Sequence, residues 1–346
     1  MTIVIPVSGM TGQYNMVIPF FRGKKILITG GCGNLGLTLS EQLMGQECAV
    51  ALLDTRPPQW ASGCTLPKGW SFHQIDMASP DVWQGFAHQA DIIFHLAAQT
   101  SAYRANADVA ADWKINVQPV IKLLETSVNK GWRPDVVFAS TATVVGITDD
   151  PYKPHGHAER PSTIYDVHKL AVEKYLWHYV DQLGGRATAL RLANVYGPGA
   201  LTGAQDRGIV NMMVRKALAG EDIVVFGTGE YVRDYVLTFD VVAAFLSAAV
   251  HIEDVSGRPF FIGTAQGHTI NELAAKIAST VGGRTGKVVA VKHQPFPDGA
   301  LAIERRSFIA NASDFMHKTD WQARVMLDEG IRMTMQSLSD NAAERG

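Results

Sequence analysis

The chain has 346 residues, of which 47% are hydrophobic and 18% charged, and its formal net charge is -2. This composition predicts a globular cytoplasmic protein with a sizeable buried core, and it excludes a strongly basic nucleic-acid-binding surface and a long charged tail. The three cysteines form no C-x-x-C pair, so they indicate neither a disulfide framework nor a zinc site.

The first 21 residues are apolar but are interrupted by proline and glycine, and no lysine or arginine precedes them. They lack the charged start of a signal peptide and the roughly 20 uninterrupted apolar residues of a membrane span. We expect an N-terminal extension. Either the true start is Met16, or the segment is an ordered arm that packs on a partner subunit.

A glycine-rich turn follows the first predicted strand. The elements in order are a strand at 25–29, a turn at 30–36, a helix from Leu37 to about Gly45, and a strand at 49–53 closed by Asp54. This order is typical of a dinucleotide-binding unit, in which backbone amides at a helix N-terminus approach a pyrophosphate. Asp54 can accept hydrogen bonds from ribose hydroxyls and repel a 2′-phosphate, which favours NAD over NADP. Arg56 weakens that preference.

Strands and helices continue to alternate up to about residue 192. Predicted strands cover 72–76, 91–96, 135–139 and 187–192, and predicted helices begin at Ser79-Pro80, at Val109 and near Tyr165. The helix at 109–129 contains Pro119, which would kink it or restart its first turn. The alternation predicts an α/β fold with a doubly wound parallel sheet, whose ligands bind beyond the carboxyl ends of the strands.

Tyr165 and Lys169 lie four residues apart at the start of an apolar-periodic run. Four residues are about one helical turn, so the two side chains share a face. A neighbouring ammonium favours the phenolate and lowers the pKa of the tyrosine, which makes it a proton acceptor near neutral pH.

Beyond Gly199 the alternation becomes less regular. Predicted helices cover 209–218, 241–250 and 329–338, predicted strands cover 223–226, 260–263 and 288–291, and Thr269 with Glu272 forms a capping box.

These motifs, taken in order, resemble the extended short-chain dehydrogenase/reductases, and within them the nucleotide-sugar epimerases and dehydratases. The resemblance covers roughly residues 24–340. It rests on the glycine turn at 29–36, Asp54, Asp76, the run 95–98, Asn116, Ser140-Thr141, Tyr165 with Lys169, the run 194–199, Arg233-Asp234 and Ile262-Gly263.

The resemblance implies a Rossmann domain, at 22–194 plus about 236–258, that binds NAD. A smaller C-terminal α/β lobe, at 195–235 plus about 259–346, would grip a nucleoside diphosphate sugar. The helices at 109–129 and 165–180 would form a four-helix bundle in a homodimer.

Family resemblance also implies the roles of individual residues. Tyr165 would be the acid/base, Lys169 would hold the nicotinamide ribose, and Thr141 would bond the reacting hydroxyl. Asn194 and Arg233 would face the diphosphate, with Arg305 or Arg306 in addition. The NAD contacts would be Gly30, Gly33, Asn34, Leu35, Gly36, Asp54, Asp76, Met77, Leu96, Ala97, Ala98, Asn116, Tyr165 and Lys169.

Two positions after Thr141 narrow the implied reaction. Dehydratases and decarboxylases of this family carry an acidic residue one or two places further on, where this chain has Ala142 and Thr143. The segment is therefore similar to the 4-epimerase pattern, and we expect the tyrosine to work without a second carboxylate. The chain departs from the pattern at Val145, usually tyrosine, at Pro119, usually glycine, and before Asn311, where an Arg-Pro-Gly-Asp run is missing.

The main hypothesis is NAD-dependent epimerisation of a nucleoside diphosphate sugar through a transient keto intermediate. A one-way NAD(P)H-dependent 4-keto reductase needs the same residues. A non-catalytic dinucleotide sensor is a third possibility, against which the intact Thr141, Tyr165 and Lys169 argue. His95 reads as a core histidine. His155 and His157 lack carboxylate or cysteine partners at metal-binding spacing, so we expect no metal.

Overall fold

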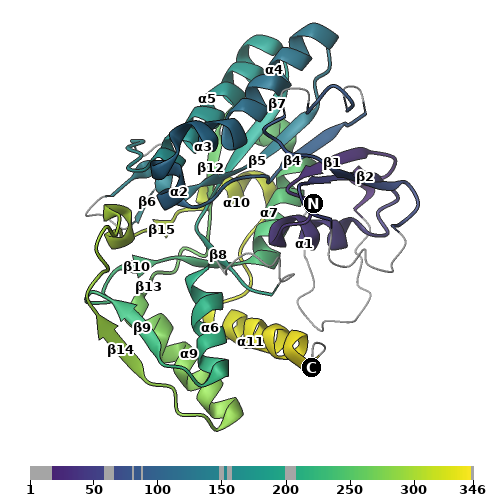
Figure 1. Cartoon of the computed structure of the whole chain (residues 1–346). Helices are drawn as coiled ribbons and strands as arrows, with labels where there is room; N and C mark the ends of the chain where they lie inside the picture. Colours follow the sequence, from purple (N-terminus) through teal and green to yellow (C-terminus); the bar gives the residue numbers. More distant parts are fainter. Residues whose placement is uncertain are drawn as a thin grey trace.

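The central feature of the protein, seen in a computed structural model, is a seven-stranded sheet whose neighbouring strands all run parallel (Figure 1). The structure describes residues 18–57, 66–79, 82–86, 89–147, 152–153, 158–198 and 208–343. From edge to edge the strands are β12 (Pro259–Ile262), β7 (Arg186–Leu192), β5 (Asp135–Thr141), β4 (Ile92–His95), β1 (Lys25–Thr29), β2 (Ala49–Asp54) and β3 (Trp70–Gln74). The strand order reverses between β1 and β4, which confirms the expected doubly wound α/β fold.

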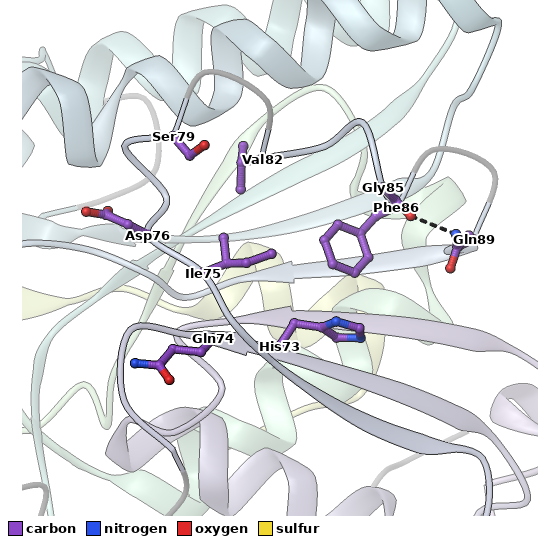
Figure 2. A pocket seen from close by; sticks show the side chains of 9 residues that line it. All are labelled: His73, Gln74, Ile75, Asp76, Ser79, Val82, Gly85, Phe86 and Gln89. Carbon is purple, nitrogen blue, oxygen red and sulfur yellow. Dashed lines mark hydrogen bonds between the residues drawn. The ribbon is translucent and has the colours of Figure 1, made fainter.

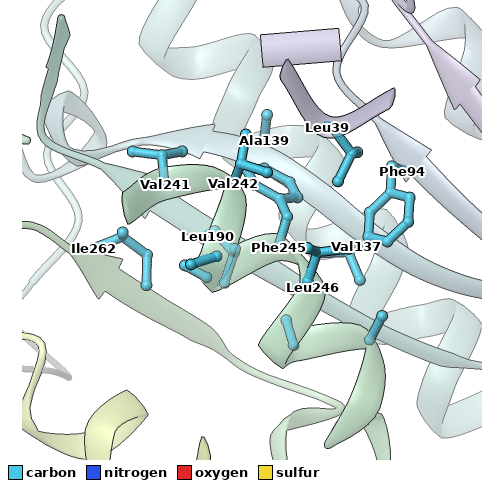
Figure 3. Packing of buried hydrophobic residues seen from close by; sticks show 14 of the residues in the cluster. Leu39, Phe94, Val137, Ala139, Leu190, Val241, Val242, Phe245, Leu246 and Ile262 are labelled. Carbon is cyan, nitrogen blue, oxygen red and sulfur yellow. The ribbon is translucent and has the colours of Figure 1, made fainter. Parts of the chain in front are cut away.

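Helices cover both faces of this sheet, so its strands are apolar on both sides. Helices α1 (Asn34–Leu43) and α7 (Thr238–Val250) share one hydrophobic cluster with Ile26 and Ile28 of β1. Leu27, between them in the strand, belongs to the cluster on the other face with α4 and α5. Figure 3 shows the first cluster, where Phe245 of α7 lies edge-on to Phe94 of β4, with ring centroids 6.3 Å apart.

The N-terminal edge of the described chain belongs to this core. Phe21 is fully buried, and the Ile18 amide donates to Gln46 Oε1 over 2.7 Å. The folded unit therefore begins no later than Ile18. The remainder of the predicted extension, residues 1–17, lies outside the described residues, as do Cys64, His155, His157 and Gly199.

The helices that carry the predicted site begin where the sequence provides caps. The predicted helix at 109–129 is two helices, α3 (Val109–Asn116) and α4 (Gln118–Lys130), so Pro119 restarts the helix in its first turn. Helix α5 (Ile164–Leu183) starts at Thr163, whose side chain accepts from the Asp166 amide, and ends at left-handed Gly184.

Four of the predicted elements differ from the structure for a local physical reason. Helix α1 begins at Asn34, because the helical turn starts inside the glycine run. Strand β3 ends at Gln74. Two residues later, the Asp76 carboxylate accepts a hydrogen bond from the Ala78 amide. No helix follows Ser79 in the described part, where residues 82–86 form turns. Val288 is 93% exposed, and the strand there is β14 (Val291–Gln294), formed by pairing with β9 rather than by burial.

The rest of the chain builds a smaller group of elements, drawn below the sheet in Figure 1. Helices α6 (Ile209–Ala219), α9 (Ile270–Thr285) and α11 (Leu327–Ala343) share a third hydrophobic cluster. The predicted capping box at Thr269 and Glu272 is confirmed at the start of α9. In the described ranges, no helix is both long and apolar enough to cross a membrane.

Short strand pairs complete the molecule. They are β8 (Asn194–Tyr196) with β11 (Tyr235–Leu237), β9 (Ile223–Phe226) with β14, β10 (Val232–Arg233) with β13 (His268–Thr269), and β6 (Tyr152–Lys153) with β15 (Ile309–Ala310). The remaining helices are α2 (Ala102–Ala107), α8 (Ile252–Val255) and α10 (Ser313–Thr319), with short 3-10 turns at Pro19–Phe21, Ala142–Val145 and Ala302–Arg305.

Candidate active site

The glycine turn after β1 leaves a concave surface of backbone atoms, here called the cradle. Side chains at the glycine positions would fill this space. Gly30 has a φ of +66°, and a Cβ there would lie 2.8 Å from the Ala97 amide nitrogen. A Cβ on Gly36 would lie 2.7 Å from Gly31 Cα. Helix α1 begins directly after Gly33 without a side-chain cap, so its first amides are open to an anion. The turn therefore fits a dinucleotide pyrophosphate.

Asp54 and Asn34 add polar groups around this cradle. The Asp54 carboxylate accepts from the Cys32 amide over 3.0 Å through one oxygen and from the Arg56 amide over 3.2 Å through the other. Asp54, the last residue of β2, thus holds the glycine turn in place. The side-chain carbonyl oxygen of Asn34 is buried and has no hydrogen-bond partner among the described residues.

The loop after β4 closes the cradle from the other side. The Ala97 amide donates to Thr29 Oγ1 over 3.2 Å, and Thr29 Oγ1 lies 2.8 Å from His95 Nδ1. Burial, followed by the charge of Lys169, lowers the pKa of His95 to about 3, so His95 is a neutral core residue. Its ring stacks on Phe138. Leu96, Ala97 and Ala98 follow in the half-buried loop above the sheet.

Asn116 holds this loop in place. Its side-chain oxygen accepts from the Gln99 amide over 3.1 Å, and its nitrogen donates to the Gln99 carbonyl and to Asp112 Oδ1, each over 3.0 Å. Asp112 also accepts from His168 Nδ1 over 2.6 Å when the histidine carries that proton. These bonds give Asn116 a positioning role at the cofactor loop and join α3 to α5.

Asp76 lies at one end of a pocket of about 550 Å³ beside β3. Figure 2 shows Ile75 and Phe86 in its apolar middle, with Asp76 at the opposite end from Gln89. Met77 is buried in the neighbouring core. The exposed Asp76 carboxylate is placed where the predicted adenine contact requires a polar group beyond the end of the strand.

The three predicted catalytic residues come from two adjacent elements. Thr141 is the last residue of β5, while Tyr165 and Lys169 lie in the first turns of α5, which packs on β5. The Lys169 Nζ lies 5.8 Å from the centroid of the Tyr165 ring and donates to the Ala139 carbonyl over 2.8 Å. The structure therefore brings the tyrosine and the lysine together on one helix face at the carboxyl edge of the sheet.

Burial makes the protonated form of Lys169, a residue that is 3% exposed, less favourable than in water. Loss of solvation lowers its pKa to about 8, while Asp112 and Glu173 oppose that shift. The ammonium also lies 4.7 Å above the centroid of the Phe138 ring. The lysine is still mostly charged at neutral pH, as is needed to stabilise a phenolate.

A buried ion pair fixes α5 against the sheet below these residues. Glu173 of α5 is fully buried, accepts from the Ser140 hydroxyl, and pairs with Arg191 of β7, whose Nη2 lies 2.6 Å from its Oε2. A second carboxylate, Glu159, also contacts the Arg191 guanidinium. This network joins α5 to β5, the strand that ends at Thr141, and to the neighbouring β7, and so sets the position of the helix.

Two arginines converge near Asn194, at the start of β8. The Arg233 side chain donates to the Val232 and Glu304 carbonyls over 3.0 and 2.8 Å. Arg306 donates to Asn194 Oδ1 over 3.2 Å. Within the described ranges, no carboxylate lies within ion-pair distance of either guanidinium. Arg305 is exposed and stacks on Phe296, so Arg306 is the better candidate of that pair.

Electrostatics mark the arginine pair as a site for an anion. Burial and the charge of Arg306 lower the pKa of Arg233 to about 9, and burial lowers that of Arg306. Arg233 is only 5% exposed, which rules out a surface ion pair. A buried and a half-buried cation, both bonded only to neutral oxygens, are costly unless an anion such as a diphosphate joins them.

The sequence interpretation missed one carboxylate. Asp166 follows Tyr165 and is buried, and it accepts a hydrogen bond from the Thr143 hydroxyl, whose oxygen lies 2.7 Å from Thr141 Oγ1. The expectation that the tyrosine works without a second carboxylate stays a prediction, because these bonds give Asp166 a place beside the site and no step in the reaction. The signal was the residue after Tyr165, since an acid at the third position of a helix turns back toward its start.

The fold and the site define a Rossmann-type protein with a tyrosine–lysine pair above its sheet. A sequence model of the NAD dependent epimerase/dehydratase family matches residues 26–263, and the chain belongs to this family. The predicted resemblance is confirmed, and NAD is the cofactor of the family.

Individual relatives extend over nearly the whole chain. The UDP-glucose 4-epimerase of Mycolicibacterium smegmatis is 30% identical over 320 residues, which cover 90% of this chain and 97% of the relative. The structure of UDP-glucose 4-epimerase from Thermotoga maritima with UDP-glucose has a TM-score of 0.79, 29% identity, and coverage of 92% and 99%. The Thermus thermophilus UDP-glucose 4-epimerase, solved with NAD, has a TM-score of 0.76, 28% identity, and coverage of 91% and 98%.

Other activities also occur among similar proteins. A UDP-glucuronic acid decarboxylase of Danio rerio and a dTDP-4-dehydro-6-deoxyglucose reductase of Escherichia coli are 26% and 24% identical, over 91% and 92% of this chain. Family membership therefore establishes an enzymatic family and its cofactor, and leaves the reaction open.

Proposed function

We propose that this protein is an NAD-dependent 4-epimerase of a nucleoside diphosphate sugar. The observation that carries the proposal is the placement of Thr141 and the Tyr165–Lys169 pair at the carboxyl edge of the sheet, together with Arg233 and Arg306 near Asn194. Neither of the two positions after Thr141 carries the acidic residue expected of a dehydratase or decarboxylase. The similarity to UDP-glucose 4-epimerases supports the same reaction class.

The chain's own residues account for the proton movements of this reaction. Tyr165, as phenolate, accepts the proton of the sugar hydroxyl at C4, and Thr141 holds that hydroxyl by a hydrogen bond. NAD, when bound, would supply the acceptor for the hydride of the carbon that bears the hydroxyl, and the donor that returns this hydride to the opposite face of the keto sugar. Tyr165 returns the proton to the oxygen of the keto sugar after the sugar has turned over in the pocket.

Lys169 and the glycine cradle hold the cofactor for this exchange. The Lys169 ammonium would bond the nicotinamide ribose and stabilise the phenolate, exchanging its present bond to the Ala139 carbonyl for those contacts. The pyrophosphate would lie on the amides of Asn34 and Leu35, the first two of α1, and Asp54 would reach the adenosine ribose.

The arginine pair supplies the binding energy for the substrate. The guanidinium groups of Arg233 and Arg306 match diphosphate oxygens in geometry, and the Asn194 amide lies between the sugar edge of the site and Arg306. A sugar anchored only through its diphosphate is free to present either face, as epimerisation needs.

A one-way 4-keto reductase remains the second candidate, because it uses the same tyrosine, lysine and threonine and because a reductase occurs among the relatives. The two enzymes differ in how they keep their cofactor. An epimerase regenerates NAD in every turnover and should retain it through purification, whereas a reductase consumes added NADH or NADPH. Cofactor extraction after denaturation, with an absorbance spectrum, tests this: protein free of NAD that consumes NADH would favour the reductase.

We also propose a homodimer formed through α3, α4 and α5. Large apolar side chains are exposed on these helices, among them Trp113 at 39%, Val167 at 42% and Val128 at 60%. In Figure 1 these three helices lie together on one face of the sheet. Pairing this face with a second copy would bury the exposed groups.

A further inference from the structure

Asp112 of α3 and His168 of α5 form a buried pair next to the catalytic lysine. His168 Nδ1 lies 2.6 Å from Asp112 Oδ2. Asp112 is 2% exposed and His168 is 7% exposed, so water competes little for this bond. His168 directly precedes Lys169 in the chain, and none of the proton transfers proposed for Tyr165 involves the pair. Burying two polar side chains costs desolvation free energy, so their other partners indicate what the pair does.

The second oxygen of Asp112 holds the loop that follows β4. Asp112 Oδ1 accepts from Gln99 Nε2 over 2.7 Å and from Asn116 Nδ2 over 3.0 Å. Backbone groups fix the orientation of both amides, because the Ser101 amide donates to Gln99 Oε1. In the same way the Gln99 backbone amide donates to Asn116 Oδ1. Each side-chain nitrogen is therefore the donor, and Asp112 Oδ1 accepts both bonds whatever the charge of the acid.

The loop held in this way contains proposed NAD contacts. Residues 96–98 precede Gln99 and are half-buried at the end of β4. A Cβ on Gly30 would lie 2.8 Å from the Ala97 amide nitrogen, so this loop packs directly against the glycine turn. Asp112 thus connects the loop at 96–99 to α5, at the residue before the catalytic lysine.

Asp112 also acts on Lys169 through its charge. Burial lowers the pKa of Lys169 to about 8, and the charges of Asp112 and Glu173 oppose this shift. Glu173 is bonded to Arg191, whereas no lysine or arginine lies within ion-pair distance of Asp112 among the described residues. His95, on the β4 side of the lysine, is neutral. Asp112 is therefore the carboxylate that acts on Lys169 without a cationic partner of the arginine or lysine type.

We propose that Asp112, held by His168, is a positioning residue that joins the loop at 96–99 to the turn of α5 that carries Lys169. This inference rests on the proposed function and deepens it. Oδ1 of Asp112 holds the loop, and its negative charge favours the ammonium that stabilises the phenolate. The acid acts through Gln99, Asn116 and Lys169 rather than on the sugar itself.

The first test separates the charge of Asp112 from its hydrogen bonds. In Asp112→Asn the side-chain oxygen can still accept from Gln99 and Asn116, and the new amide can donate to the other tautomer of His168. We expect NAD affinity within about threefold of the wild type by isothermal titration. The pKa of Lys169 should fall further, so kcat/KM should begin to decline at a lower pH than in the wild type. A decline at the wild-type pH would overturn the role of the charge.

The second test removes the donor and keeps the carboxylate. His168→Leu leaves Asp112 Oδ2 buried without a partner, so Asp112 and the loop bonded to it should shift. We expect at least about tenfold weaker NAD binding and a kcat lower by about 10- to 100-fold, the range for displaced catalytic geometry. His168→Asn places an amide nitrogen near the position of Nδ1 and should restore both to within about threefold.

Tyr179→Phe is the matched control. It removes a buried hydrogen bond of the same helix, from the Tyr179 hydroxyl to the Pro134 carbonyl over 2.7 Å, about three helical turns beyond His168. This variant should lower Tm by a few degrees and leave NAD affinity, kcat and the pH profile as in the wild type. Equal losses in His168→Leu and Tyr179→Phe, or normal NAD affinity and kcat in His168→Leu, would overturn the inference and leave the epimerase proposal standing.

The two proposals fail in distinguishable ways. A wild-type protein that binds NAD and converts no nucleotide sugar would overturn the epimerase proposal, and the NAD affinity of His168→Leu would still decide whether the pair positions the loop. If His168→Leu does not fold, the pH profile of Asp112→Asn decides the inference.

Discussion

At the scale of single residues, the site depends on how burial changes the charge of its groups. Lys169 is a buried ammonium within one helical turn of Tyr165. Arg233 is buried, Arg306 is half-buried, and both guanidiniums are bonded to neutral oxygens. Each of these cations destabilises the protein while it lacks an anionic partner, and each stabilises an anion that binds beside it. The phenolate and the diphosphate are the two anions that the proposed reaction brings to them.

Replacement of Tyr165 by phenylalanine tests the proposed base. We expect kcat to fall by about 10²- to 10⁴-fold, because the variant has no group to accept the hydroxyl proton. NAD content should be unchanged, since the ring is kept. Tyr175→Phe, on the exposed side of the same helix, is the matched control and should be fully active. Near-normal turnover by Tyr165→Phe would remove the tyrosine from the mechanism.

The pH dependence tests the charge state of Lys169. Its pKa is lowered to about 8 by burial, and the protonated ammonium is the form that stabilises the phenolate. The group is therefore active below this pH and inactive above it, so kcat/KM should decline as pH rises from about 8 to 10. A basic limb that stays flat up to pH 10 would show that the ammonium is not required.

At the scale of elements, the site depends on where helices start relative to strand ends. Helix α1 starts within the glycine turn and α5 starts one residue before Tyr165, so both begin close to the carboxyl edge of the sheet. The buried Glu173–Arg191 pair and the Asn116–Gln99 bonds then fix α5 and the β4 loop. These contacts place the catalytic groups without needing the groups themselves for stability.

Adding a methyl group to the glycine turn should disrupt cofactor binding. In Gly36→Ala the new Cβ would meet Gly31 Cα at 2.7 Å, so the turn must shift, at a cost of about 1–3 kcal/mol. We expect at least tenfold weaker NAD binding by isothermal titration. Gly283→Ala adds the same methyl inside α9, where no heavy atom lies within 4 Å, and should stabilise the protein by about 0.5–1 kcal/mol. Equal NAD affinity in both variants would contradict the proposal that the glycine turn binds NAD.

The sequence was informative where local chemistry decides structure. The glycine turn, the apolar strands, the Thr269 capping box and the restart at Pro119 follow from neighbouring residues, and the structure has all of them. The bounds of β14 could not be predicted, since the strand is exposed and pairs with the distant β9. The contacts of Asp166 and Arg306 were likewise hidden, because their partners Thr143 and Asn194 lie far away in the chain.

At the scale of the whole molecule, the fold brings the proposed cofactor-binding and substrate-binding residues to the carboxyl edge of the central sheet. The sheet holds the cofactor turn and the tyrosine–lysine pair, and the short strands β8 and β10 bring Asn194 and Arg233 to the same side. The outer surface of α3, α4 and α5, away from the buried side chain of Lys169, carries exposed apolar residues. We therefore expect association and catalysis to be separable.

A charge placed on the apolar helix face should separate the subunits. Trp113→Glu, on α3, replaces an exposed ring with a carboxylate that a second copy would have to bury. Light scattering after size-exclusion chromatography should show a dimer for the wild type and a monomer for the variant. Val288→Glu changes a side chain that is 93% exposed and outside this face, so it should leave the mass unchanged. A wild-type monomer would contradict the proposed dimer.

The most direct test of the central claim is conversion of nucleotide sugars by the purified protein with no cofactor added. UDP-, GDP-, CDP- and dTDP-sugars are incubated one at a time, and the configuration at C4 is followed by proton NMR. We predict that at least one sugar reaches an equilibrium mixture of its two C4 epimers, and that the Tyr165→Phe variant leaves it unchanged. Failure of every sugar to interconvert, with stoichiometric consumption of added NADH on a 4-keto sugar, would contradict the epimerase assignment.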